Sequence, residues 1–239
     1  MSKKILEIKN VNISFDSGKT YILKNISFSV SPWEVLSIIW MNWTGKSSLL
    51  KAIAWISPIF SWEIIRNYKK ASYVPQKISL DSTFPIKISE FIKIYNKDIT
   101  DSLIIKYLKK FNSDYLAYKN VNNLSWWEFQ KMLIVSSLIS NPDILLLDEP
   151  TSWIDIVWED IFYKNIAEVK KAFPKISIIL VSHNLHLVYK NSDKVVCLHK
   201  NNLCCHWTPL EIKENTEINE IFWEYILPYE HKPHSKHNH

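Results

Sequence analysis

The spacing of apolar and polar residues predicts an antiparallel β layer at the N-terminus, followed by alternating strands and helices. Residues 5–11 and 22–30 alternate as half-buried strands do, on either side of a turn at 16–19. Short apolar runs predict buried strands at 35–39, 71–74, 144–147 and 176–181. Helical spacing predicts helices at 47–56, 128–139 and 159–172, and several Lys-rich helices within 86–112. Strands this apolar, alternating with helices, are typical of a parallel α/β core.

The chain has 239 residues, which fits one domain or one core with an inserted subdomain. The elements predicted near the C-terminus are a closing hairpin at 194–199 and 202–206 and short helices at 210–215 and 217–226. We expect a single domain over residues 1–227, with a helical subdomain at about 78–140, and a His-rich tail over 228–239.

Composition indicates a cytoplasmic globular protein. The net charge of +5 comes from Lys and Glu mixed along the chain, and no basic arm for nucleic acid occurs. The sequence contains no apolar run of roughly 18 residues, so no membrane span is predicted. Its start also lacks the apolar stretch of a signal peptide. The three cysteines, Cys197, Cys204 and Cys205, form no evident disulfide framework and favour a reducing compartment.

Residues 40–47 have the spacing of a phosphate-binding P-loop. They read Trp-Met-Asn-Trp-Thr-Gly-Lys-Ser after a predicted buried strand and before a predicted helix, so Trp40 replaces the first glycine of G-x-x-x-x-G-K-S. In such a loop the backbone amides bind phosphate, Lys46 neutralises the β- and γ-phosphates, and the Ser47 hydroxyl binds Mg²⁺. Gly45-Lys46-Ser47 alone would be a weak signal, because any helix N-terminus can carry such residues.

Two acids follow the apolar strand at 144–147. Asp148 stands where the acidic partner of a P-loop is expected and would hold Mg²⁺ through water. Glu149 would polarise the attacking water as a general base. A carboxylate that caps the next helix would explain one acid here. Two acids at this distance from a P-loop favour the catalytic interpretation.

At residues 124–128 the sequence Leu-Ser-Trp-Trp-Glu resembles L-S-G-G-E, the signature of the ABC ATPase family. Other motifs of that family occur in its order along nearly the entire chain. Phe15 matches the aromatic residue that stacks on adenine, and Gln76 matches the Q-loop glutamine that senses the γ-phosphate and the metal. Asp155 matches the D-loop, and His183 matches the switch histidine that contacts the γ-phosphate. Together these motifs are far more specific than any one of them.

The resemblance covers roughly residues 5–227 and implies a P-loop NTPase (RecA-like) α/β core with an N-terminal antiparallel β layer and an inserted α-helical signature subdomain. It implies hydrolysis of ATP with Mg²⁺. The residues that it assigns to catalysis are Glu149, His183, Gln76 and Lys46, and those for Mg²⁺ are Ser47, Gln76 and Asp148. Those that it assigns to the nucleotide are Phe15, Trp40, Asn42, Trp43, Thr44, Gly45, Lys46, Ser47, Ser48, Ser125, Trp126, Trp127 and Asp155.

Tryptophan stands where this family has glycine. The chain holds 11 Trp and 2 Gly, whereas ordinary proteins contain about 7% Gly. Reading every Trp as Gly completes the P-loop, the signature and the turn before the D-loop. Because one rule fits all eleven positions, we hypothesise that UGA codons, which some bacterial lineages read as glycine, were translated as tryptophan. The alternative is a true pseudo-ATPase with a plugged site, although its other catalytic residues are intact.

Two features of the C-terminal third bear on the cargo. Residues 197–212 resemble ATP-binding subunits of zinc/manganese importers, a group in which His-rich ends are common. Cys204 and Cys205 are adjacent on a predicted strand and point to opposite faces, which favours packing over metal ligation. An incidental polar end is the alternative to a Zn²⁺-binding tail. The histidines of that tail are His231, His234, His237 and His239.

The resemblance also implies partners. Two copies would pair head to tail, with each ATP between one P-loop and the partner's Ser125. Two membrane permease subunits and, indirectly, an extracytoplasmic metal-binding protein would complete an importer, with no nucleic acid. The chain would be peripheral, on the cytoplasmic face of the membrane. An ABC ATPase subunit of another importer or an exporter stays open, as does a catalytically dead structural subunit.

Overall fold

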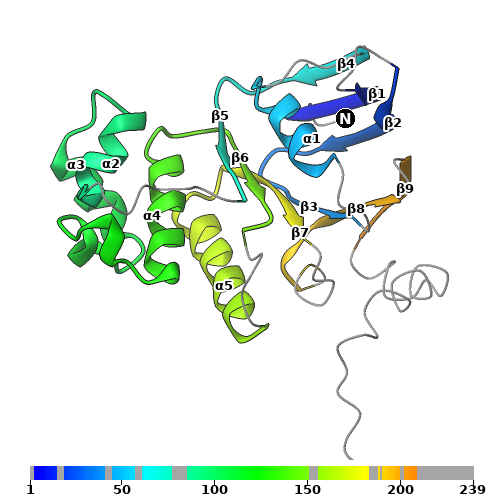
Figure 1. Ribbon diagram of the computed structural model, residues 1–239. Coiled ribbons are helices and arrows are strands. Elements are labelled where there is room, and N and C mark those ends of the chain that lie inside the picture. Colours follow the sequence, from blue (N-terminus) through cyan, green and yellow to red (C-terminus); the bar gives the residue numbers. More distant parts are fainter. Residues whose placement is uncertain are drawn as a thin grey trace, which may run out of the picture.

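The computed structural model describes residues 3–14, 19–40, 45–56, 61–76, 85–150, 156–182, 188, 190–199 and 202–208. Two β-sheets lie side by side, and a group of helices extends from the far edge of the larger sheet (Figure 1). Two sets of predictions lie outside the described residues: the turn at 16–19, apart from its last residue, and the helices at 210–215 and 217–226.

A three-stranded antiparallel sheet forms the N-terminal layer. Its central strand β1 (Leu6–Ser14) pairs with β2 (Tyr21–Val30) on one side and β4 (Ser61–Arg66) on the other. Leu6 and Ile8 point to the core, and a register shift then moves the next buried position to Val11. The predicted antiparallel layer is therefore present, with the unpredicted β4 as its third strand.

The larger sheet has six strands in the order β5-β6-β7-β3-β8-β9. All neighbouring pairs are parallel except β8 and β9, which form the predicted closing hairpin. Every residue of β6 and β7 is buried, as the continuous apolar runs predicted. The strands are β3 (Val35–Trp40), β5 (Ala71–Val74), β6 (Ile144–Asp148), β7 (Ser177–Ser182), β8 (Lys194–His199) and β9 (Asn202–Trp207).

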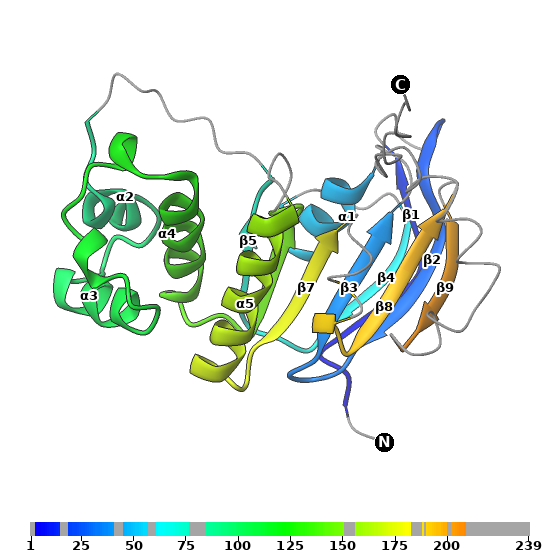
Figure 2. The ribbon, with the colours of Figure 1, turned by 90° about the horizontal axis from the view of Figure 1, so that it is seen from below.

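The two faces of the six-stranded sheet are covered by different elements (Figure 2). On one face, α1 (Lys46–Ile53) and the three-stranded sheet share an apolar cluster with Leu146 of β6. On the other face, α4 (Trp126–Leu138) and α5 (Ile156–Ala172) share a second cluster with its neighbour Leu147. Successive residues of β6 thus enter opposite cores, as the two-residue period of a strand requires.

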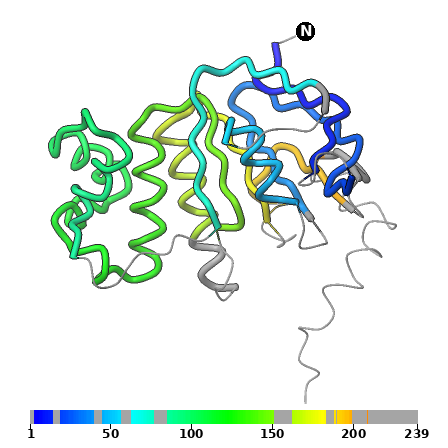
Figure 3. The backbone as a smooth tube through the Cα atoms, turned by 45° about the horizontal axis from the view of Figure 1, so that its top comes forward, coloured from blue at the N-terminus to red at the C-terminus, as the bar shows by residue number. Residues whose placement is uncertain are grey.

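The helices α2 (Ile88–Tyr95) and α3 (Asp101–Lys109) pack on α4 at the end of the molecule away from β1 and β2 (Figure 3). They confirm that the Lys-rich stretch at 86–112 holds several helices. Within the described part of the chain, none of the helices combines the length and the apolar character that a membrane crossing needs.

The predicted helix boundaries are right to within a few residues. The first helix ends at Ile53 rather than at 56, because the backbone turns left-handed at Trp55, where φ is 64°. The signature helix begins two residues before the predicted 128, since Ser125 caps it. The last long helix begins at Ile156 instead of 159.

Candidate nucleotide site and signature helix

The candidate site begins where β3 leads toward α1. Gly45 is the N-cap of α1, with a φ of 103° in the left-handed region. Glycine reaches that region without the clash that a Cβ would cause, so this position accounts for one of the two glycines in the chain. Lys46 is the first residue of the helix, and Ser47 and Ser48 follow in its first turn. The helix therefore opens with free backbone N–H groups, as a phosphate site requires.

Three predicted catalytic side chains meet at the carboxyl ends of the parallel strands. Lys46 Nζ forms an ion pair with Glu149 Oε1, and both side chains are largely buried. Gln76, which follows β5, donates from Nε2 to Glu149 Oε2 at 3.1 Å. The two contacts occupy both oxygens of the carboxylate, although 103 residues separate Lys46 from Glu149 and 73 separate Gln76 from it. The fold thus assembles the predicted set from three separate segments.

Glu149 has a strained backbone. Its φ is 42°, in the left-handed region that residues with a Cβ rarely adopt. Such a conformation costs on the order of 1 kcal/mol and persists only where the surroundings impose it. Here the rigid end of β6 precedes Glu149, and its carboxylate is held by Lys46 and Gln76. The left-handed backbone turns the chain directly after Asp148, so that Asp148 and Glu149 contact different partners.

Asp148 is 1% exposed and accepts a hydrogen bond at Oδ2 from the Tyr73 hydroxyl, at 2.8 Å. Burial, and then the negative charge of Asp148, raise the pKa of Tyr73, so the phenol stays protonated and can donate. A hydrogen bond with Ser47 has the smaller, opposite effect on that pKa. Sequence motifs gave no role to Tyr73, whose only signal was its place on the strand before Gln76.

Oxygen ligands make this edge suitable for Mg²⁺. Asp148 supplies a buried carboxylate, Ser47 a hydroxyl and Gln76 an amide oxygen, and Mg²⁺ is usually bound by one or two carboxylates together with substrate phosphates. Throughout the described ranges no cluster of three or more His, Cys, Asp or Glu side chains occurs. The donor set therefore fits a nucleotide-bound Mg²⁺ and not a closed transition-metal cage.

The signature residues lie on a different element. Ser125 is the exposed N-cap of α4 and accepts from the Glu128 amide, while Glu128 accepts from the Ser125 amide at 2.9 Å. Lys119 donates to both oxygens of Glu128, at 3.0 and 2.8 Å, and this contact is the main cause of the lowered pKa of Glu128. Trp126 and Trp127 form the first turn, with stacked rings 6.3 Å apart. Glu128 therefore fixes the start of the helix.

Other predicted site residues are not placed. Trp40 ends β3, but nothing is described of its side chain. The remaining ones lie outside the described residues and are Phe15, Asn42, Trp43, Thr44, Asp155, His183, His231, His234, His237 and His239.

A parallel sheet with a glycine-capped helix after one strand and paired acids after another defines a P-loop ATPase fold. The comparison with protein families identifies the class further. The family model described as "ABC transporter" matches residues 23–152, which is more than half of the chain. The chain belongs to the ABC transporter family, as the predicted signature and P-loop indicated.

Relatives cover nearly all of the chain. The zinc import ATP-binding protein ZnuC of Wigglesworthia glossinidia brevipalpis is 35% identical over 221 residues, which are 92% of this chain and 93% of that protein. ZnuC of Buchnera aphidicola subsp. Baizongia pistaciae is also 35% identical, over 98% of this chain and 97% of its own.

Solved structures share the fold. CbiO1 of Clostridium perfringens, part of the ABC transporter complex cbiONQ, superposes with a TM-score of 0.78 at 22% identity, over 95% of this chain and 97% of its own. The ADP conformation of MJ1267, an ATP-binding cassette of an ABC transporter, gives 0.79 at 17% identity, over 92% and 99%. The predicted α/β ATPase fold is thereby confirmed.

Proposed function

We propose that this chain is the ATP-hydrolysing subunit of an ABC importer for a divalent metal, zinc or manganese. The observation that carries the proposal is the convergence of Lys46, Gln76 and Glu149 beside the glycine-capped start of α1. Relatives at 35% identity that are named zinc import ATP-binding proteins support zinc as the cargo.

In the proposed mechanism, binding of ATP breaks the ion pair between Lys46 and Glu149. Lys46 turns to the nucleotide phosphates, and the released Glu149 accepts the proton of the attacking water. Ser47 and Asp148 would hold Mg²⁺, which supplies neutralisation of phosphate charge when bound. A second copy completes the site head to tail, because Ser125 is exposed and caps α4, an element that lies apart from α1 (Figures 1 and 2).

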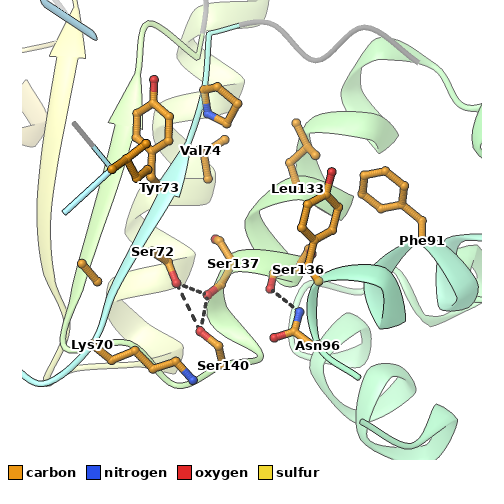
Figure 4. Close-up of a pocket in the computed structure, with 14 residues that line it drawn as sticks. Lys70, Ser72, Tyr73, Val74, Phe91, Asn96, Leu133, Ser136, Ser137 and Ser140 are labelled. Carbon is orange, nitrogen blue, oxygen red and sulfur yellow. Dashed lines mark hydrogen bonds between the residues drawn. The ribbon is translucent and has the colours of Figure 1, made fainter. Parts of the chain in front are cut away.

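The permease would dock in a groove beside the strand that leads to Gln76. This groove of about 520 Å³ lies between β5 and the helices α2 and α4 (Figure 4). Pro75, directly before Gln76, lines it, as does Tyr95, which is 66% exposed. Both apolar and polar side chains line the groove, Phe91 and Leu133 among the first and Asn96 and Ser136 among the second, which suits an amphipathic helix of a membrane subunit. Binding there would place the chain at the cytoplasmic face of the membrane, with the helical subdomain of residues 78–140 as the docking element.

We further propose that glycine occupies the eleven Trp positions in the natural protein. Trp33 lies at the third position of the turn Ser31–Glu34, which the Glu34 N–H closes at 3.3 Å on the Ser31 oxygen. Its φ is 66°, and its side chain is 57% exposed. Pro32 followed by positive φ describes a type II turn, which calls for glycine at this position.

The backbone at Trp55 gives a second, independent reason to propose glycine in the natural protein. Its amide bonds to the Ala52 oxygen at 3.3 Å and that of Ile56 bonds to the Lys51 oxygen at 2.8 Å, which together form a Schellman motif after α1. The central residue of this motif is left-handed and usually glycine, yet here it is Trp55, 73% exposed. Asn takes four of the other left-handed positions, and Asn tolerates them far better than Trp does.

Peptide mass spectrometry of the protein from its native source tests the glycine proposal directly. Glycine at positions 33, 40, 55, 126 and 127 is expected, and tryptophan there would overturn it. As a physical check, Trp33→Gly should raise the free energy of unfolding by about 1 kcal/mol, because it relieves a left-handed Cβ. Trp127→Gly is the matched control. It should lower stability, since Trp127 is helical and packs on the core.

Metal-limited growth tests the transport proposal. Cells that lack the gene should take up less radioactive zinc, and a gene for the eleven-glycine variant, in which each Trp is replaced by Gly, should restore uptake together with its permease. Enhanced retention of zinc in the deleted strain would indicate an exporter instead. Removal of the proposed metal-binding histidines, His231, His234, His237 and His239, should weaken zinc binding to the purified variant and leave basal ATP hydrolysis intact.

A further inference from the structure

Tyr73 is placed by the register of β5 against β6. Tyr73 pairs directly with Leu146, so both side chains lie on the face of the sheet that α1 covers. Asp148 stands two residues beyond Leu146 and shares that face. The long side chain of Tyr73 reaches this position, with its hydroxyl 2.8 Å from Asp148 Oδ2. The sheet therefore directs the Tyr73 hydroxyl to the Asp148 carboxylate, and the contact does not depend on a loop.

The hydroxyl of Tyr73 contacts two of the groups that fit Mg²⁺. It donates to Asp148 Oδ2 at 2.8 Å and also forms a hydrogen bond with Ser47. It thereby links the end of β6 with the first turn of α1, the two elements that must present oxygen atoms to one ion. Since Oδ2 is engaged with the phenol, the other oxygen of Asp148 is left for the metal or its water.

We propose that Tyr73 is a positioning residue for the Mg²⁺ of the nucleotide site. Tyr73 holds Asp148 and Ser47 at a fixed separation before the ion binds. These two side chains therefore lose less rotational freedom when Mg²⁺ binds. Outer-shell partners of metal ligands commonly contribute about 10- to 100-fold to metal affinity. The proposal rests on the proposed ATPase function, and it assigns no direct contact between Tyr73 and substrate.

The test is the affinity for the metal itself, with Mn²⁺ as a spectroscopic substitute for Mg²⁺. Electron paramagnetic resonance would follow Mn²⁺ binding to the full-length eleven-glycine variant with a non-hydrolysable ATP analogue. Tyr73→Phe keeps the ring and removes only the hydroxyl. We expect its Mn²⁺ affinity to fall about tenfold, while its affinity for the analogue in EDTA changes by less than about twofold, since no phosphate contact is lost.

Tyr68→Phe is the matched control. Tyr68 is likewise partly buried, and its hydroxyl donates to the Ile53 oxygen at 2.6 Å and forms a hydrogen bond with Arg66, but no hydrogen bond links it to Asp148. Its Mn²⁺ affinity should stay at the parent value. Equal affinities of parent and Tyr73→Phe, or equal losses in both variants, would overturn the positioning role. Absence of any analogue binding to the parent would instead count against the proposed ATPase function.

Discussion

Two regions of the chain are proposed to bind ATP, one in its own site and the other in the partner's site, yet they are built in opposite ways. At the carboxyl ends of the strands, Lys46 and Glu149 have side chains only 14% and 11% exposed, and Asp148 is 1% exposed. At the start of α4, Ser125 is exposed and its helix opens toward solvent. The first region is held by partners within one chain. The second presents a helix N-terminus that only another molecule can cover.

The strand-end region is therefore expected to act within a single chain, whereas the start of α4 is expected to act only when two chains pair. Damage to the strand-end region should affect nucleotide binding or chemistry in every state of assembly. Damage to the start of α4 should leave binding by a single chain intact and appear only when two chains meet. The four variants below, all in the eleven-glycine variant, test this separation.

Glu149→Gln should have the largest effect. Loss of the general base should lower ATP hydrolysis by about 10²- to 10⁴-fold, while ATP binding persists because glutamine does not neutralise Lys46. Phosphate release measures the rate, and size-exclusion chromatography with ATP should show an accumulated dimer. Hydrolysis within tenfold of the parent would mean that Glu149 is not the base.

Lys46→Ala should weaken ATP binding about 10- to 100-fold, which corresponds to the loss of charge-assisted hydrogen bonds to phosphate. Fluorescent-nucleotide titration measures the dissociation constant. Lys51→Ala is the control, because Lys51 lies in the last turn of the same helix and should leave binding unchanged. Equal losses in both variants would point to damage to α1 and not to a phosphate contact.

Ser125→Ala should lower hydrolysis by about tenfold, equivalent to about 1.4 kcal/mol in the transition state, and leave ATP binding by the monomer unchanged. It also removes a helix cap, which costs about 1 kcal/mol of stability. Thr100→Ala removes the corresponding cap of α3 and isolates that structural effect. If Thr100→Ala reduced hydrolysis equally, the signature role of Ser125 would be refuted.

Glu128→Gln should have the smallest effect. The pKa of Glu128 is lowered from its ordinary 4.5, chiefly by Lys119, so the charged form stabilises the fold above about pH 4.5. That stabilisation, less than about 1 kcal/mol because the side chain of Lys119 is 36% exposed, disappears as the pH falls through the lowered pKa. The unfolding temperatures of the parent and of Glu128→Gln should therefore differ at pH 7 and converge as the pH falls below the lowered pKa of Glu128. A constant difference would exclude ionisation as its cause.

The sequence predicts the sheet and the strand-end region well because their signals are local. A short, uninterrupted apolar run followed by acids favours a buried strand, and Gly45-Lys46-Ser47 favours the start of a helix. The strand β4 was missed, since its apolar residues Ile64 and Ile65 form too short a run to show a period. Its identity as a strand depends on pairing with β1, in a register that runs from Leu6 opposite Arg66 to Asn12 opposite Ser61.

The individual side-chain contacts between distant segments could not be predicted from the sequence. Motifs placed Lys46 and Glu149 at one site, but not in an ion pair with each other. The Q-loop match at residues 73–76 assigns no role to Tyr73. Its contact with Asp148 follows from the register of two strands, which a single sequence does not specify. The roles given to Asp155 and His183 stay predictions, because both residues lie outside the described part of the chain.

The two left-handed corners at Trp33 and Trp55 have a practical consequence for laboratory production. If the natural corners are glycines, an expression host that inserts tryptophan would make a product that folds with two strained corners and bulky rings on its surface. Such material would misrepresent the protein in every assay of activity, solubility or crystallisation. A synthetic gene with ordinary glycine codons at all eleven positions is therefore the starting material that the geometry recommends.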